Sequence, residues 1–405
     1  MMMKIVVFPM VVAVLTTAAQ AARTQERFVQ DRFAIGFWVD PPADQITDAR
    51  YKEIADANFT LVHGAFGPRN RKEVQEQLAL CEKHGLKAIV RSDLSRPEEL
   101  PDSPACWGYH IVDEPNTAAF AGLKATVDAI RKNRPGKLAY INLLPDYANS
   151  AQLGASTYDE YVSRFCKEVG PDVLCMDYYP MLTPTADGRD GYCGNLEVMR
   201  KYALKYKIPF WNFFNTMPFG PHYDPTESHL RWQIYTSLAY GAKGVLYFCY
   251  WTPRGGEFPK GGAIISADGR RTRHYDQTKR INAAVKNLGP TLMKLASLKV
   301  IRIRPTDDPA AALQHSPIKT VSKGADYLIG IFRHSDGRRA ALLVNYDHNY
   351  TTWPTVEFDA PDNDVIEVDQ SDGKEKPARD DSPDMPGLQI SLDAGEGRLF
   401  LLPAN

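Results

Sequence analysis

The stretch Trp107-Gly-Tyr-His-Ile-Val-Asp-Glu-Pro-Asn116 predicts a β-strand that ends at two adjacent carboxylates. Its aromatic and β-branched residues are typical of a strand, and Pro115, which has no backbone N–H, cannot extend a sheet ladder beyond Asp113 and Glu114. A helical pattern begins near Asn116. Carboxylates that stand where a strand meets a βα loop are typical of the active face of an α/β barrel. The alternative is that Asn116 caps the helix and the two acids only complement its dipole.

Strand-like runs recur along the chain between residues 33 and 253, and most are separated by amphipathic helical patterns. The runs span 33–40, 59–65, 86–92, 107–112, 137–144, 172–179, 208–214 and 244–251. Apolar strands that alternate with helices predict parallel βαβ units, and eight such units favour an α/β fold of the (β/α)8 TIM barrel type over an open doubly wound sheet. No Gly-x-Gly-x-x-Gly motif follows the first strand, which argues against dinucleotide binding. A last helix is expected over 277–297.

From about residue 298 the pattern changes to short strands separated by turn residues. They are expected at 300–304, 327–332, 340–345, 355–358, 365–368, 388–392 and 398–402. Such a series predicts a small C-terminal antiparallel β-sandwich that supports the barrel. The expected domains are a signal peptide over 1–21, a catalytic barrel over 22–297 and a β-sandwich over 298–405.

The amino terminus resembles a secretory signal peptide. Lys4 precedes an apolar run over 5–15, and Ala19-Gln20-Ala21 has the small-x-small pattern of a cleavage site. The run is too short to cross a bilayer as a helix, so we expect no membrane insertion. The expected location is therefore secreted or periplasmic.

Composition argues against several classes of partner. The chain has 48 basic and 49 acidic residues, and a net charge of −1 does not favour nucleic acid. The six cysteines form no Cys-x-x-Cys pair and no histidines have zinc spacing, so we expect no metal site and no cofactor. The 20 tyrosines are compatible with stacking on sugars.

In a barrel, the active face would collect the residues that end each strand. Here these are acids, amides and large aromatic residues, which suit a polyhydroxylated ligand because rings stack on sugar faces and polar groups bind hydroxyls. The expected substrate-binding residues are Trp38, Asp40, His63, Asn142, Tyr178, Tyr179, Trp211, Asn212, Asn215, Tyr250 and Trp251. Taken singly, each also has a structural interpretation: Tyr179 or Trp251 as core, and His63 as a hydrogen-bonded structural histidine.

With these residues at its strand ends, the sequence resembles the (β/α)8 glycoside hydrolases over roughly residues 33–297. In the large retaining group often called clan A, the fourth strand ends in Asn-Glu, and that Glu is the general acid/base. Glu114 matches it, whereas Asp113 stands in place of the Asn. The nucleophile of that group is a Glu at the end of the seventh strand. The corresponding stretch here, Phe210-Trp-Asn-Phe-Phe-Asn-Thr216, has no carboxylate.

Two other arrangements would work without a carboxylate on the seventh strand. The Asp-Glu pair also resembles hexosaminidase-like barrels, in which the Glu protonates the leaving oxygen and the Asp orients the substrate's own acetamido group as nucleophile. Asp113 and Glu114 match that pair. Alternatively, Asp177 on the sixth strand is the second carboxylate, far enough away to admit a water, as in an inverting enzyme.

We therefore expect an exported glycoside hydrolase that acts on an oligo- or polysaccharide. Glu114 is the expected general acid, with its pKa raised by partial burial and a like charge, and Asp113 or Asp177 is the assisting carboxylate. The alternative is a non-catalytic carbohydrate-binding barrel that has lost the strand-seven nucleophile. A metal-dependent barrel hydrolase or lyase is disfavoured, because the nine histidines show no recognisable ligand pattern.

Overall fold

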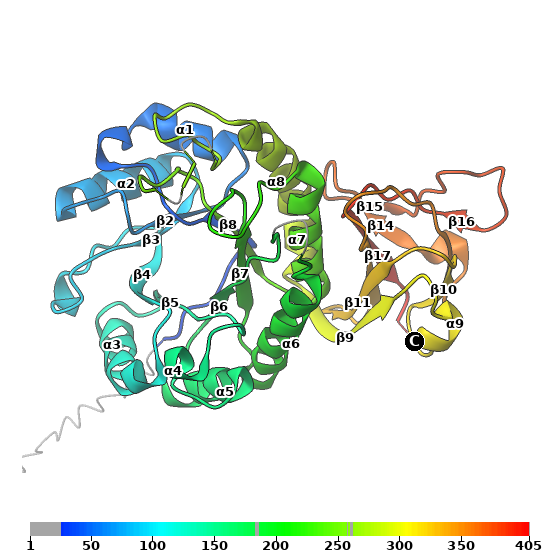
Figure 1. Cartoon of the computed structure of the whole chain (residues 1–405), viewed down its shortest axis with the longest axis horizontal. Helices are drawn as coiled ribbons and strands as arrows, with labels where there is room; N and C mark the ends of the chain where they lie inside the picture. The colour runs from blue at the N-terminus through cyan, green and yellow to red at the C-terminus, as the bar shows by residue number, and fades with distance from the viewer. Residues whose placement is uncertain (1–25, 183–185, 257, 260–261, 405) are drawn as a thin grey trace, which may run out of the picture.

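The computed structural model describes residues 26–182, 186–256, 258–259 and 262–404 (Figure 1). The expected signal peptide over 1–21 lies outside the described residues. Within them, no helix has both the length and the apolar character needed to cross a membrane.

All eight expected strands are present, and they pair in parallel. They are β1 Ala34–Phe37, β2 Leu61–Gly64, β3 Lys87–Val90, β4 Cys106–Asp113, β5 Leu138–Asn142, β6 Leu174–Asp177, β7 Phe210–Asn215 and β8 Gly244–Phe248. Their order is β1-β8-β7-β6 in one sheet and β2-β3-β4-β5 in the other. Next to β5 and β6, the Leu143 N–H donates to the Cys175 carbonyl at 2.9 Å. This parallel α/β arrangement fits a TIM barrel.

Helices surround the strands (Figure 1). They are α1 Asp48–Asp56, α2 Arg71–Lys83, α3 Phe120–Asn133, α4 Ser150–Leu153, α5 Tyr158–Glu168, α6 Arg189–Tyr206, α7 Glu227–Ala239 and α8 Arg273–Leu292, with short 3-10 turns η1 Ala43–Gln45, η2 Pro97–Glu99 and η3 Thr117–Ala119. Several begin at a side-chain cap, such as Thr47 on α1 and Thr157 on α5. Asn116 caps η3, as the alternative interpretation of the Asp-Glu stretch expected, by accepting from the Ala118 N–H.

The helix expected over 277–297 ends earlier than its pattern indicated. α8 stops at Leu292, and the next residues open strand β9, Leu295–Ile303, which pairs with β11, Tyr327–His334. A short apolar run fits a helix or a strand equally well, and here the pairing with β11 decides. The domain boundary expected at 297/298 therefore falls inside β9.

An antiparallel β module follows, as expected. Its larger sheet has the order β15-β14-β17-β12-β11-β9, and its smaller sheet is β10-β13-β16. The remaining elements are β10 Ile318–Val321, β12 Arg339–Asn345, β13 Thr355–Phe358, β14 Ile366–Val368, β15 Glu375–Pro377, β16 Leu388–Gln389, β17 Gly397–Leu402, α9 Pro309–Ala312 and η4 Asp362–Asp364. Side chains from both sheets, including Ile329, Val356 and Phe400, share one apolar core.

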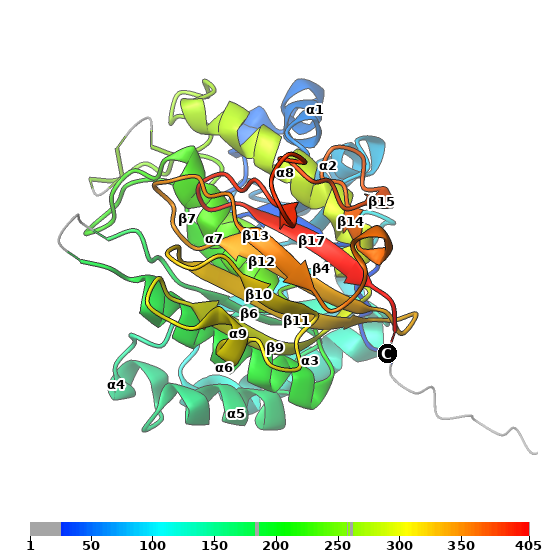
Figure 2. The same ribbon diagram turned by 90° about the vertical axis from the view of Figure 1, so that its right-hand side faces the viewer.

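The larger sheet covers α7 with its other face (Figure 2). Leu342 and Leu399 of this sheet belong to the same buried cluster as Trp232 and Leu238 of α7. The approach is close enough to require a glycine in β11, because a Cβ at Gly330 would stand 2.4 Å from the Ala239 carbonyl oxygen. Burial of α7 between strands and sheet ties the β module to the parallel sheets.

Candidate active site

A β-bulge in β4 decides which of the two adjacent acids faces the interior. In the pairing of β4 with β5, His110 lies opposite Tyr140 and Asp113 lies opposite Asn142. Between these two pairs, β4 contains one residue more than β5. Tyr140 and Asn142, two residues apart, lie on the same face of β5. His110 and Asp113 therefore share that face although they are three residues apart.

Asn142 joins two carboxylates at the carboxyl ends of the strands. Its Nδ2 donates to Asp113 Oδ1 at 3.1 Å and to Asp177 Oδ1 at 2.8 Å. The two acceptor oxygens are thus at most about 6 Å apart. Three consecutive strands, β4, β5 and β6, each contribute one member of this acid–amide–acid group.

Glu114 follows directly and lies at the rim of the same group. Its φ of 48° is in the left-handed region, which turns the chain away from the strand, and its N–H donates to the Asn142 carbonyl at 2.9 Å. Its carboxylate accepts no hydrogen bond from any described residue and reaches solvent. The Glu114 carboxyl is therefore accessible from solvent.

Burial raises the pKa of all three acids, and the proximity of like charges adds to this rise for Glu114 and Asp177. Burial, followed by the charge of Asp113, raises the pKa of Glu114. Burial also raises the pKa of Asp113, opposed by the hydrogen bond from Asn142. The largest rise is at Asp177, only 6 % exposed, whose pKa is raised by burial and then by the charges of Glu114 and Asp113. The group thus keeps a proton where isolated carboxyls would lose theirs.

Two tyrosines stand beside the acids. Tyr147, in the loop after β5, is 57 % exposed and packs edge-on against Tyr178 at 5.2 Å. Burial of its hydroxyl, followed by the charge of Asp177, raises the pKa of Tyr147, and the same two causes act on half-buried Tyr179. Sequence reasoning missed Tyr147. Its signal was an aromatic residue in the loop directly after a strand end.

An aromatic stack continues the site toward β1 and β2. Trp38 lies parallel to the His63 ring at 4.4 Å, with Phe66 at 5.1 Å. His63 Nε2 is 3.2 Å from His110 Nδ1. Burial lowers the pKa of His63, and burial followed by the charge of Arg91 lowers that of His110 to about 4. Both imidazoles are therefore neutral, and His63 lies buried and hydrogen-bonded, as its structural interpretation expects.

Asp40 is buried beneath a loop and has its acceptors occupied. Oδ1 accepts from the Phe66 and Gly67 N–H groups, and Oδ2 accepts from Gln77 Nε2. Burial outweighs these donors and raises the pKa of Asp40 from 3.8 to about 6. Asp40 therefore holds the loop after β2 rather than facing a ligand.

The raised pKa of Asp40 predicts a stability that falls as pH rises. The folded state binds this proton more tightly than the unfolded chain, so the contribution is complete below pH 4 and is lost through pH 6. Asp40→Asn lacks the titration, and Gln77 can offer the new amide its Oε1, which has no partner among the described residues. Urea unfolding should show the wild type losing about 3 kcal/mol relative to Asp40→Asn between pH 4 and pH 7. A difference that stays constant over this range would contradict it.

Several expected substrate contacts point away from the acids. Trp211 is at the amino end of β7, where its Nε1 donates to Gln30, and Asn212 donates outward to Tyr192 of α6. Tyr250 stacks on Phe37 on the outer side of β1. All three side chains are fully buried. We leave them out of the site.

Asn215 and Trp251 also differ from expectation. Asn215, buried at the end of β7, accepts from the Met181 N–H and exchanges backbone hydrogen bonds with the Gln233 side chain of α7. Trp251 packs under Arg50, 5.0 Å from the ring centroid, and lines a groove away from the acids. Asn215 is a structural link, and Trp251 is at most a distant rim residue.

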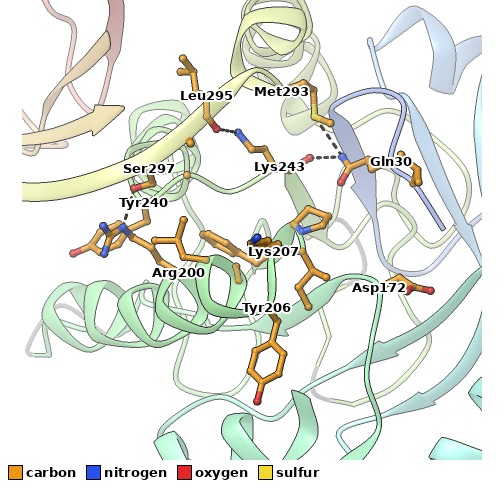
Figure 3. Close-up of a pocket in the computed structure, with 18 of the residues that line it drawn as sticks. Gln30, Asp172, Arg200, Tyr206, Lys207, Tyr240, Lys243, Met293, Leu295 and Ser297 are labelled. Atoms are coloured by element: carbon orange, nitrogen blue, oxygen red, sulfur yellow. Dashed lines mark hydrogen bonds between the residues drawn. The ribbon is translucent and has the colours of Figure 1, made fainter. Parts of the chain in front are cut away.

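A cavity of about 620 Å³ lies at the other end of the strands (Figure 3). It is lined by residues that precede β6, β7 and β8, among them Asp172, Lys207 and Lys243. Lys243 Nζ donates to the Leu295 carbonyl at 2.6 Å, and burial lowers the pKa of Lys243 to about 8. Active sites of such barrels lie at the carboxyl ends of the strands, so this cavity is not the candidate site. The described residues contain no group of three or more His, Cys, Asp or Glu suited to a metal ion.

Solved structures share this architecture. A GH42 beta-galactosidase from G. stearothermophilus superimposes with a TM-score of 0.59 at 9% identity, covering 93% of this chain and 100% of that one. A family 39 glycoside hydrolase from Bacteroides cellulosilyticus WH2 gives 0.51 at 12%, covering 94% and 82%. The chain shares the fold of these two proteins.

The likeness is one of fold only. A beta-galactosidase from Halorubrum lacusprofundi gives a TM-score of 0.50 at 14% identity, covering 64% of this chain and 59% of that one, so this chain spans about three fifths of its length. No protein-family model and no curated protein matches the sequence.

Proposed function

We propose that the protein is a glycoside hydrolase in which Glu114 is the general acid. The observation that carries this proposal is the cluster of three acids, Asp113, Glu114 and Asp177, at the carboxyl ends of the parallel strands. Asn142 donates hydrogen bonds to Asp113 and Asp177 and so holds these two together. Glycoside hydrolysis requires one carboxyl that is protonated at working pH and one that is ionised. The proton retained by this group meets the first requirement.

Glu114 suits the acid because its carboxyl reaches solvent and binds no other described side chain. It would protonate the glycosidic oxygen as the bond to the anomeric carbon breaks. On an acetamido sugar, the oxygen of the substrate's own acetamido group would form the new bond to the anomeric carbon as the leaving group departs. The Glu114 carboxylate would then remove a proton from the water that attacks this carbon and releases the acetamido oxygen. Tyr147 and Tyr179 flank the acids and offer aromatic faces to the sugar.

Asp113 is the better assisting carboxylate of the two candidates. Its Oδ2 has no partner among the described residues and reaches solvent, while Asn142 helps to keep it ionised. Asp177 is nearly buried and is the most reluctant of the three to ionise. We assign Asp113 to stabilising the positive charge that develops on the sugar or on its acetamido group. We assign Asp177 to positioning Asn142, from which it accepts a hydrogen bond.

Hydrolysis of aryl glycosides tests this proposal. The purified mature chain is incubated with N-acetylhexosaminides and their 2-hydroxy counterparts, with Glu114→Gln as control. Cleavage confined to acetamido sugars would support assistance by the substrate through Asp113. Cleavage of 2-hydroxy sugars would direct attention to Asp177 as the second carboxylate. If oligosaccharides as well as aryl glycosides stay intact, the proposed activity is wrong.

A non-catalytic carbohydrate-binding barrel is the second candidate. The observation that favours it is the end of β7, where Phe213, Phe214 and Asn215 supply no carboxylate. It predicts binding of a sugar without release of reducing ends. We further propose export, on the pattern over residues 1–21, which would bring external polysaccharides within reach.

A further inference from the structure

A cleft rich in arginine lies beside the aromatic stack. It has a volume of about 620 Å³ and is formed by the segments that follow β2 and β3. Its charged lining residues are Arg69, Arg71, Arg91, Arg96, Asp93 and Glu99. Positive charge is in excess, although the protein as a whole has a net charge of −1.

The two acids of this cleft are already engaged. Glu99 pairs with Arg96 at 3.2 Å and Arg71 at 3.5 Å, and Asp93 accepts from Ser95. By contrast, the guanidinium groups of Arg69 and Arg91 have no hydrogen bond or ion pair with any described residue. An unpaired guanidinium in a concave site presents a fork of donors that matches a carboxylate or sulfate.

The register of the sheet places Arg91 close to the acids. Val90 pairs with Tyr109, so Arg91 follows β3 beside His110 of β4. His110 and Asp113 lie on the same face of β4, and Asp113 is one layer of side chains nearer the carboxyl end. The two layers are roughly 7 Å apart along the strands. This spacing is of the order of one sugar unit.

A second hollow extends the cleft across the same end of the strands. It has a volume of about 660 Å³, and Phe66 and Arg69 line both hollows. Trp251 and Arg254 line its far side. Asp40, Asp44 and Asp268 also line this second hollow, so the excess of arginine is confined to the first cleft. Phe66, 46 % exposed, offers an aromatic face between the two hollows. A neutral glycan could use this aromatic face, but it would have no use for the unpaired guanidinium groups of Arg69 and Arg91 in the first cleft.

We propose that this cleft is a subsite for an anionic glycan, in which Arg69 and Arg91 bind the carboxylate or sulfate of a sugar next to the one at Glu114. The inference rests on the proposed glycosidase function, because it assigns the cleft to the same substrate. Holding the anionic group here also keeps it apart from Asp113 and Glu114, which would repel it.

Binding is measured in a Glu114→Gln background, so that hydrolysis does not interfere. The probes are polygalacturonate and its methyl ester, which differ in carboxylate charge, and a sulfated galactan and its desulfated form. Affinity electrophoresis compares this protein with a version that also carries Arg69→Gln and Arg91→Gln. Arg333→Gln, an exposed arginine of β11, is the matched control.

We expect at least one charged probe to bind roughly tenfold or more tightly than its neutral form, and the Arg69/Arg91 double change to abolish this preference. The pair that shows the preference identifies carboxylate or sulfate. Equal binding of charged and neutral forms, or a preference that survives the double change, overturns the inference. A preference for anions combined with no hydrolysis by the wild type overturns the glycosidase proposal alone.

Discussion

Replacing Glu114 by Gln is expected to lower kcat by roughly 10²- to 10⁴-fold, with KM little changed. Gln keeps the size of the side chain but has no proton to give to the leaving oxygen. The loss should be largest for substrates with poor leaving groups and smaller for nitrophenyl glycosides, whose leaving group needs little protonation. Because the raised pKa of Glu114 keeps the acid protonated to higher pH, the alkaline limb of the wild-type profile should disappear in Glu114→Gln.

A matched control separates this effect from a general change of charge. Glu357→Gln removes one carboxylate from an exposed position on β13, where it forms an ion pair with Lys319 at 3.6 Å, and should leave kcat unchanged. Equal losses for good and poor leaving groups in Glu114→Gln would contradict proton transfer as its role. Unchanged turnover would remove Glu114 from the mechanism.

The strands of the barrel-like part were predictable because their signals are local. β-branched and aromatic runs that end at prolines or glycines gave all eight strands, and periodicity gave most helices. The end of α8 was not predictable in this way. Residues 295–297 suit a helix as well as a strand, and the deciding partner, β11, lies some thirty residues later in the chain.

Which side chains face the site was harder to predict, because it depends on strand parity. A regular β4 would place His110 and Asp113 on opposite faces, and only the bulge brings them to one face. The bulge position is occupied by Ile111 and not by a glycine or proline, so the sequence does not mark it. The same uncertainty of parity led Asn212 and Tyr250 to be expected in the site, whereas both point toward helices.

The role of Asn142 was underestimated for a related reason. From the sequence it was one amide among several strand ends, with a sugar hydroxyl as its expected partner. Its actual partners, Asp113 and Asp177, lie 29 and 35 residues away in sequence. Only the parallel register of β4, β5 and β6 brings the three side chains together.

Replacing Asn142 by Leu should therefore shift the pH dependence rather than simply weaken the enzyme. Asn142 donates to the charged forms of Asp113 and Asp177, so its loss raises the pKa of both. Asp113 would then be ionised only at higher pH, and the acidic limb of the kcat/KM profile should move upward. A hydrogen bond to a charged group contributes about 1.5–3 kcal/mol, so kcat/KM near pH 5 should fall roughly 10- to 100-fold and recover partly in alkaline buffer.

Asn212→Leu is the control that makes this shift informative. Asn212 is as deeply buried as Asn142, but its Nδ2 donates to Tyr192 and Ser237, away from the acids. Both variants lose buried hydrogen bonds and should unfold at lower temperature, yet only Asn142→Leu should move the acidic limb. Profiles of kcat/KM from pH 4 to 9, with thermal unfolding followed at each pH, distinguish the two. If Asn142→Leu loses activity by the same factor at every pH, the amide supports the fold and does not set the ionisation of Asp113.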